Sequence, residues 1–236
     1  MLAGLVAGAL NVIAGGGSFL TIPVLIFLGL PPTVANATNR VGVLLQNVSG
    51  VWGFHRHAVL DWRWTTWAGL PATAGAALGT WAALTVGDDA FRRILAAVMI
   101  LATLAPVLGG GGRTGHHAHP RALPLVVAGF FLAGIYGGFL QAGVGFVILA
   151  LTSMAGLDLV RGNAVKVLAV LLLTSLSLAI FWAHGAIHWP MGLALGAGNF
   201  LGGIIGVRLA VAKGHGWLKR VVSLAIVAFA LRLWFW

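Results

Sequence analysis

Long apolar segments make up most of this chain and constrain its fold more than any other feature. About 20 apolar residues suffice to cross the hydrocarbon core of a bilayer as a helix. Segments of that kind lie at residues 33–54, 64–86, 91–108, 160–182, 190–212 and 217–235, and two further apolar runs, 1–29 and 122–156, are interrupted by glycines. Only 8% of the residues are charged, against about 25% in soluble domains. The sequence therefore predicts an all-α polytopic membrane protein.

An internal repeat divides the chain into two halves. Shifting the sequence by 127 positions aligns residues 16–104 with 143–231 without a gap, and 19 of these 89 pairs are identical. The matches include polar and aromatic pairs: Asn36 with Asn163, His57 with His184, and Trp62 with Trp189. We predict a first transmembrane repeat at residues 1–108, a Gly/His-rich linker at 109–121 and a second transmembrane repeat at 122–236, together forming one integral domain.

The charges at the segment ends test how each split run meets the membrane. If each run makes one crossing, the halves are parallel, and the Lys and Arg residues divide seven against five between the two faces. If each run is a hairpin that returns to its own side, they divide nine against three, and the halves are inverted. Because Lys and Arg are enriched in cytoplasmic loops, we expect two inverted repeats, each a split, re-entrant helical hairpin plus three transmembrane helices. Two full crossings per split run would also give inverted halves and stay an alternative.

The strongly positive charge bears on the partners of the chain. The sequence carries 14 Lys and Arg against 4 Asp and Glu, a formal net charge of +10. No basic face or nucleic-acid-binding module accompanies this charge, so we expect no nucleic-acid partner. We attribute the charge to cytoplasmic loops beside the lipid bilayer and to an anionic substrate.

The glycine breaks in the two split runs are candidates for anion binding. The break residues are Gly15, Gly16, Gly17 and Ser18 in the first run and Gln141, Gly143 and Gly145 in the second. Each break precedes a helical arm, and the exposed N–H groups at a helix start favour an anion. The alternative is that glycine only permits a tight turn or close helix packing. Interrupted helices in inverted repeats are typical of secondary transporters, whose substrate site lies where the broken helices meet.

Two cations, Arg40 and Lys166, lie inside predicted membrane segments at nearly equivalent repeat positions. A charge inside a membrane segment is functional by default, and an arginine fork can grip two oxygens of an oxyanion. Three asparagines lie nearby and would complete such a site: Asn36, Asn39 and Asn163. The alternative is that both cations extend to the membrane interface.

Other polar residues give weaker signals. Gln46 and Asn47 lie on a partly polar face of 33–54, where they would line the pathway or hydrogen-bond a neighbouring helix. His57 and His184, repeat partners at segment ends, are candidates for a proton relay, although a loop histidine beside a tryptophan is more often an interfacial residue.

The acidic residues argue against an enzyme. The four carboxylates lie at loops: Asp61, Asp88, Asp89 and Asp158. Paired carboxylates, a Ser-His-Asp arrangement and a metal-binding cluster are absent from any plausible segment. We therefore expect no enzymatic activity, no catalytic residues, no metal and no cofactor.

Glycines four residues apart predict close contacts between helices. The pairs are Gly4/Gly8, Gly75/Gly79, Gly134/Gly138, Gly198/Gly202 and Gly202/Gly206.

Three stretches, together with the repeat, carry a family resemblance. They are "AGGGSFLTIPVL" at 14–25, "GLPPTVANATNR" at 29–40 and "FHRHAVLDW" at 54–62. The chain resembles the sulfite exporter TauE/SafE family, also called the toluene sulfonate uptake permease family, over essentially its whole length. The Gly-Thr-Ser stretch usual in that family stands here as Ala37-Thr38-Asn39. The resemblance implies export or uptake of small sulfur-containing or organic anions across the bacterial inner membrane.

We therefore predict a multi-pass secondary transporter that moves a small anion, sulfite-like or sulfonate-like, by alternating access at a site between the two repeats. The alternatives are an uncoupled, channel-like anion conduit and a membrane scaffold or enzyme without transport. The identity of the anion, the direction of transport, the coupling ion and assembly as a homo-oligomer stay open.

Overall fold

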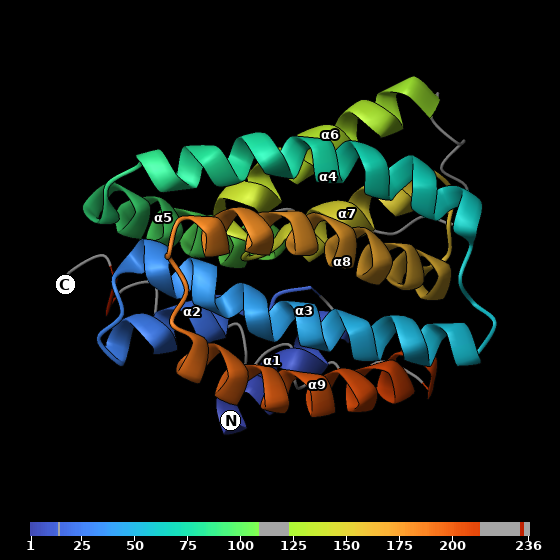
Figure 1. The fold of residues 1–236 in the computed structure, drawn as a ribbon. Coiled ribbons are helices and arrows are strands. Elements are labelled where there is room, and N and C mark those ends of the chain that lie inside the picture. Colours follow the sequence, from blue (N-terminus) through green and yellow to red (C-terminus); the bar gives the residue numbers. More distant parts are fainter. Residues whose placement is uncertain (14, 109–122, 213–231, 234–236) are drawn as a thin grey trace.

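The computed structural model describes residues 1–13, 15–108, 123–212, 232 and 233, and within these ranges the chain forms nine α-helices and no strand (Figure 1). The predicted all-α class is confirmed for this part of the chain. The predicted linker at 109–121 and nearly all of the predicted segment at 217–235 lie outside it. The helices are α1 (Leu2–Ile13), α2 (Ser18–Phe27), α3 (Pro32–Arg56), α4 (Trp62–Thr85), α5 (Asp88–Leu108), α6 (Leu123–Leu140), α7 (Val144–Met154), α8 (Leu159–Ala183) and α9 (Trp189–Ala212).

Capping residues explain where several long helices begin. The carboxylate of Asp61 accepts hydrogen bonds from the N–H groups of Arg63 and Trp64 at 3.0 and 3.2 Å, at the start of α4. Asp158 accepts from the N–H groups of residues 160 and 161 at the start of α8. Such caps satisfy amides that have no partner inside the helix. α3 begins at Pro32, whose missing N–H costs nothing in a first turn.

Two of the described helices meet the length and hydropathy criterion for a membrane span, α8 over Leu159–Ala183 and α9 over Trp189–Leu209. α3, α4 and α5 have 25, 24 and 21 residues, so each is at least about 30 Å long at 1.5 Å per residue. The predicted segments 33–54, 64–86 and 91–108 are therefore long helices, but their composition is more mixed than that of α8. In α3 the polar residues that lower the hydropathy are mostly buried.

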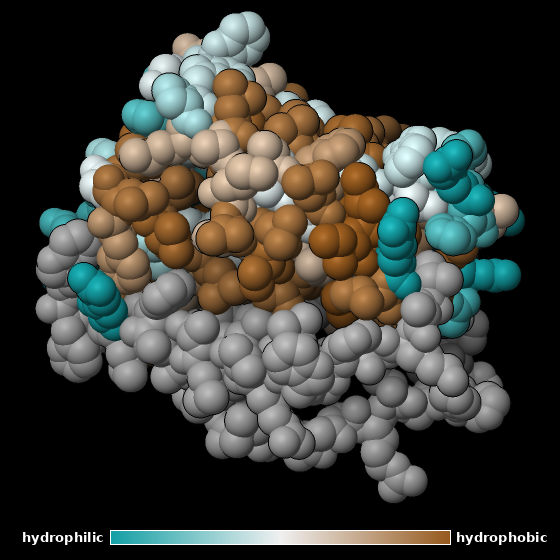
Figure 2. Space-filling model, turned by 90° about the horizontal axis from the view of Figure 1, so that it is seen from below, coloured by the Kyte–Doolittle hydropathy of each residue, from teal (hydrophilic) through white to brown (hydrophobic). Residues whose placement is uncertain are grey.

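Polar side chains are buried and many large apolar side chains face outward. Asn36, Asn39 and Arg40 are 0% exposed, whereas Leu70 and Trp81 are 67% and 66% exposed. Figure 2 shows a broad apolar surface with polar residues toward its two ends. This arrangement suits hydrocarbon surroundings, in which polar groups must find their partners inside the protein.

Each predicted split run forms two short helices that fold back on one another. α1 and α2 have 12 and 10 residues, and a Cβ added to Gly17 would meet the carbonyl of Ala7, so the chain reverses between them. α6 and α7 have 18 and 11 residues, and a Cβ added to Gly137 would meet the side chain of Val144 at 2.7 Å. Both split runs are therefore helical hairpins.

The paired glycines lie where helices touch, as predicted. A Cβ on Gly75 or Gly79 of α4 would collide with the backbone of α6, and a Cβ on Gly134 or Gly138 of α6 would collide with the backbone of α4. α1 and α9 pack in the same manner through Gly4, Gly8, Gly198, Gly202 and Gly206. Residues without side chains let two membrane helices come into backbone contact.

Equivalent helices of the two halves have equivalent partners in the opposite half. α4 packs on α6, and its repeat counterpart α9 packs on α1. α3 packs on α9, and its counterpart α8 packs on α4. Figure 1 shows α3 and α8 running in opposite directions, as α4 and α9 do. The hairpin of each half is therefore held by a long helix of the other half.

Candidate functional site

The two glycine breaks meet inside the molecule. Gly15, between α1 and α2, has φ +90°, a conformation that glycine adopts without strain. A Cβ on Gly15 would lie 2.6 Å from the Cα of Gly145, and a Cβ on Gly145 would lie 2.5 Å from the Cα of Gly15. Both positions need glycine because backbone packs directly on backbone. The hairpins of the two halves thus touch at their breaks.

Lys166 of α8 is buried and binds the C-terminal end of α1. Its Nζ donates to the carbonyl oxygens of Asn11 and Val12 at 3.0 and 2.8 Å, and to Oδ1 of Asn163 at 2.7 Å. The last carbonyls of a helix lack partners within the helix and carry the negative end of its dipole. The ammonium group therefore caps α1 from the opposite half of the chain.

Arg40 of α3 binds the C-terminal end of α6 in the same way. Its Nη1 donates to Oε1 of Gln141 at 2.7 Å, and its Nη2 donates to the carbonyl oxygens of Gly137 and Gly138 at 3.0 and 2.5 Å. The guanidinium lies 5.1 Å from the ring centre of Phe181. Arg40 is fully buried, so it does not extend to the interface.

The two cations occupy pseudo-equivalent environments. Asn11 and Gly138 are partners under the shift of 127 residues, and each offers its carbonyl to the cation of the opposite half. Each half therefore supplies one interrupted helix and one cation that caps the interrupted helix of the other half.

Neither cation faces a carboxylate. All four acidic residues of the chain lie in the described part, where Asp61 and Asp158 cap helices. Asp88 accepts from a backbone N–H of α3 at 3.0 Å, and Asp89 pairs with Arg92 at 3.2 Å. A buried cation without an opposing charge is costly. The interior of the described part therefore carries positive charge without an acidic partner.

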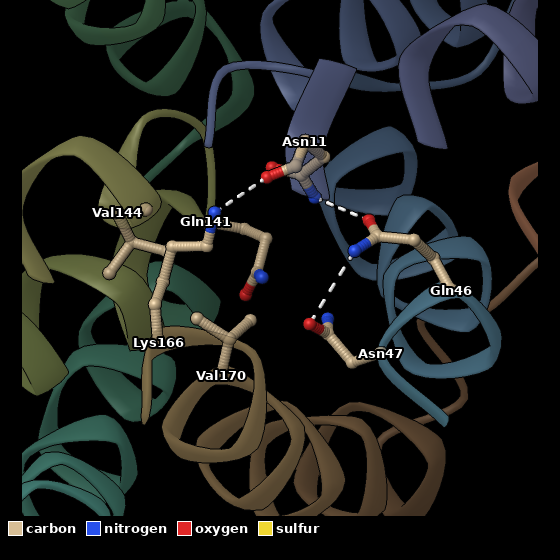
Figure 3. A pocket seen from close by; sticks show the side chains of 8 residues that line it. Asn11, Gln46, Asn47, Gln141, Val144, Lys166 and Val170 are labelled. Atoms are coloured by element: carbon tan, nitrogen blue, oxygen red, sulfur yellow. Dashed lines mark hydrogen bonds between the residues drawn. The ribbon is translucent and has the colours of Figure 1, made fainter. Parts of the chain in front are cut away.

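A small polar cavity lies beside Lys166 (Figure 3). Its volume is about 10 Å³, roughly what one water molecule needs. Asn11 Nδ2 donates to Gln46 Oε1 at 2.6 Å, and Gln46 Nε2 lies 3.5 Å from Asn47 Oδ1. The lining residues are Asn11, Gln46, Asn47, Gln141, Val144, Gly145, Lys166 and Val170. The cavity thus brings together five of the residues that the sequence singled out, two from α3, one from α8 and two from the second break.

The N-terminal turn of α7 borders this cavity through Val144 and Gly145. Gly143 is the N-cap residue of α7 with φ +78°. Among the described residues, the backbone N–H groups of Gly143 and Gly145 have no hydrogen-bond acceptor. Free amides at a helix start provide partial positive charge next to the Lys166 ammonium.

The other predicted residues contact helices and lie outside the cavity lining. Asn39 Nδ2 donates to Ser18 Oγ at 3.1 Å, and Thr21 Oγ1 donates to Asn39 Oδ1 at 2.5 Å, which ties α3 to α2. Asn36 Nδ2 donates to the carbonyl oxygen of Phe139 at 2.9 Å. Three glycines of the breaks make room for neighbours: Gly16 for the ring of Phe146, Gly17 for the backbone of α1 and Gly143 for the ring of Phe19.

The two histidines that are candidates for a proton relay lie at the surface, outside the central cavity. His57 follows α3 and His184 follows α8, and both are exposed at helix ends. Neither lines the central cavity. A proton relay through them stays a prediction.

Sequence reasoning missed Asn11, Val144 and Val170. Asn11 is the one strongly polar residue in the first 13 positions, and a polar residue in an apolar run is a usable signal. Val144 and Val170 resemble ordinary core residues, so no signal in the sequence could have singled them out.

The fold and the site define a helical membrane protein whose interior is cationic and is built around two interrupted helices. The family model described as "Sulfite exporter TauE/SafE" matches residues 1–233, and the chain belongs to this family. Membership supports a location in the membrane and a role in membrane transport.

Relatives of this chain carry names of the same kind. A "Probable membrane transporter protein ORF9" of Sinorhizobium sp is 30% identical over 98% of this chain and 90% of its own length. The "Probable membrane transporter protein YfcA" of Escherichia coli strain K12 is 27% identical over 97% of this chain and 86% of its own length. A "Probable membrane transporter protein" of Haemophilus influenzae is 28% identical over 93% of this chain and 87% of its own length. No solved structure matches the chain.

Proposed function

We propose that this protein is a secondary transporter that moves a small sulfur-containing or organic anion, sulfite-like or sulfonate-like, across the bacterial inner membrane. The observation that carries the proposal is the pair of buried cations, Arg40 and Lys166, with no carboxylate near them. An anion is the charge that such an interior lacks. The family description and the names of the relatives point to the same class of activity.

Two inverted repeats are the architecture that we infer for this transporter. In support, α4 and α9 pack on the hairpins of the opposite halves. The repeat counterparts α3 and α8 run antiparallel in Figure 1, as α4 and α9 do. An inverted pair exchanges its inward-open and outward-open forms when the two halves swap conformations. Each hairpin reverses at a glycine break inside the molecule, which favours a re-entrant element over two full crossings.

Lys166 is the residue that we assign to direct contact with the anion. It lines the cavity, and its three acceptors are neutral oxygens. A charged oxyanion is a stronger acceptor than these oxygens and would displace them. Gln46, Asn47 and the first amides of α7 would donate to the remaining anion oxygens. Arg40 does not line the cavity and acts through Gln141, whose side-chain Oε1 accepts a hydrogen bond from it.

The size of the cavity favours alternating access over an open conduit. A volume of about 10 Å³ holds about one water molecule, which is less than an oxyanion needs. Binding therefore requires the hairpins to separate at the contact between Gly15 and Gly145. A permanently open channel would need a continuous cavity through the centre.

Flux into proteoliposomes tests the proposal. Labelled sulfite and a small sulfonate are supplied to wild type, to Lys166→Gln and to Arg63→Gln, which removes one exposed cation at a helix end. We expect wild type and Arg63→Gln to transport at similar rates. Lys166→Gln should lose at least about tenfold in kcat/KM, because one charged hydrogen bond contributes about 1.5–3 kcal/mol. Absence of flux in wild type for every small anion would reject transport and favour a scaffold.

A further inference from the structure

A second, larger cavity lies where α3 and α9 end. Its volume is about 370 Å³, and it shares no lining residue with the central cavity. The lining residues are Ser49, Trp52, Gly53, Arg56, His57, Ile204, Val207 and Arg208. α3 belongs to the first half and α9 to the second, so the cavity spans a contact between the halves.

The rim of this cavity is cationic. Arg56, His57 and Arg208 are all exposed and line it together. The guanidinium of Arg56 lies 4.6 Å from the ring centre of Trp52, which fixes its plane by a cation–π contact. The four acidic residues of the chain have partners elsewhere. Two of them cap helices, one accepts from a backbone N–H at the start of α3, and one pairs with Arg92. Two arginines at one cavity suit a phosphate group, because guanidinium groups bind its oxygens with charged hydrogen bonds.

The floor of the cavity is apolar. Val207 is 2% exposed, and a Cβ on Gly53 would lie 2.9 Å from its side chain, so the two helices close the base. Trp52 is 52% exposed on the outer surface, a position typical of tryptophan at a membrane interface. A free anion gains nothing from an apolar floor, whereas a phospholipid joins a phosphate to acyl chains.

The repeat shows that packing does not require these arginines. The positions equivalent to Arg56 and Arg208 are Ala183 and Trp81, and α8 packs on α4 there without any cation at either position. Within the described residues, the cationic rim therefore belongs to the α3–α9 contact and has no counterpart at the equivalent α8–α4 contact. Basic pockets between membrane helices are a known means of binding anionic lipid headgroups.

We propose that this cavity binds the phosphate headgroup of an anionic phospholipid. Arg56 and Arg208 bind the phosphate, His57 donates a further hydrogen bond, and the acyl chains lie against Trp52 and Ile204. The bound lipid bridges α3 and α9 and thereby stabilises the contact between the two halves. This site is independent of the anion transport proposed above.

Thermal unfolding of the purified full chain in a neutral detergent tests the site, with native mass spectrometry counting the lipids that remain bound. The probes are phosphatidylglycerol, phosphatidylcholine and inorganic phosphate at matched concentrations. Wild type should gain at least about 3 °C in Tm from phosphatidylglycerol and retain one such lipid, with no comparable gain from the other two probes. Arg56→Gln/Arg208→Gln should lose more than half of this gain.

The matched control is Arg63→Gln/Arg93→Gln, which removes the same charge from exposed helix ends outside the cavity. This variant should keep the full gain. Equal loss in the control would reduce the effect to bulk charge attraction, and an equal gain from inorganic phosphate would assign the cavity to a free anion; either result overturns the proposal. If the double variant fails to fold, the single variants Arg56→Gln and Arg208→Gln carry the same comparison.

Discussion

At the scale of single residues, the two buried cations differ in what they can do. Both cap the end of an interrupted helix, but only Lys166 also lines the central cavity. The sequence singled out both because a charge in an apolar segment is costly. It could not separate their roles, because these depend on which helix ends pack beside them. Lys166 and Asn11, for example, are joined across 155 positions of the chain.

Arg40→Lys separates charge from geometry. A lysine keeps the charge but cannot reach Gln141 and two carbonyls with a planar fork, so we expect at least one of these acceptors to lose its partner, at about 1–3 kcal/mol. The variant should unfold at a lower temperature and show a reduced kcat with little change in the apparent KM for the anion. A purely raised KM would instead place Arg40 in direct contact with the substrate.

At the scale of elements, the glycine breaks explain both hairpins. Sequence reasoning could predict them because "AGGGS" and "QAGVG" interrupt apolar runs at equivalent repeat positions. The repeat predicted that the broken helices meet, but it could not predict that Gly15 packs directly on Gly145, since that contact depends on how α4 and α9 hold the hairpins. It also left the role of Gly16, Gly17 and Gly143 open, and the structure places all three against neighbouring groups.

Gly145→Ala tests the contact between the hairpins. The added methyl would lie 2.5 Å from the Cα of Gly15, and overpacking of this kind costs about 1–3 kcal/mol. We expect a fall in Tm and at least about a tenfold fall in transport. The control is Gly87→Ala, because a Cβ on Gly87 would meet nothing within 4 Å. Equal effects of the two substitutions would contradict a specific role for the contact.

At the scale of the whole molecule, the repeat and the charge count were the informative parts of the sequence. They predicted inverted halves, and the antiparallel course of α3 and α8 is in keeping with that prediction (Figure 1). Neither composition nor periodicity indicated that a long helix of each half packs on the hairpin of the other half. The small residues that make it feasible, such as Gly79 and Gly134, identify a packing face without naming the helix that packs there.

Single-cysteine labelling tests the inverted topology directly, because the chain contains no cysteine. Arg63→Cys and Asp158→Cys should react with an impermeant maleimide from one face of the membrane, and Asp89→Cys from the opposite face. In inside-out vesicles the pattern should reverse. Labelling of the cysteines at 63 and 158 from opposite faces would reject two re-entrant hairpins in inverted halves.

The packing of α1 on α9 also has a consequence for how the chain is made. Gly4 rests on the backbone of Leu195, so α1 has to wait for α9, the last of the nine described helices, before it can pack on its principal partner. Contacts between such distant positions form slowly because a long loop must close first. α1 therefore lies in the bilayer with its glycine face uncovered until α9 has been inserted.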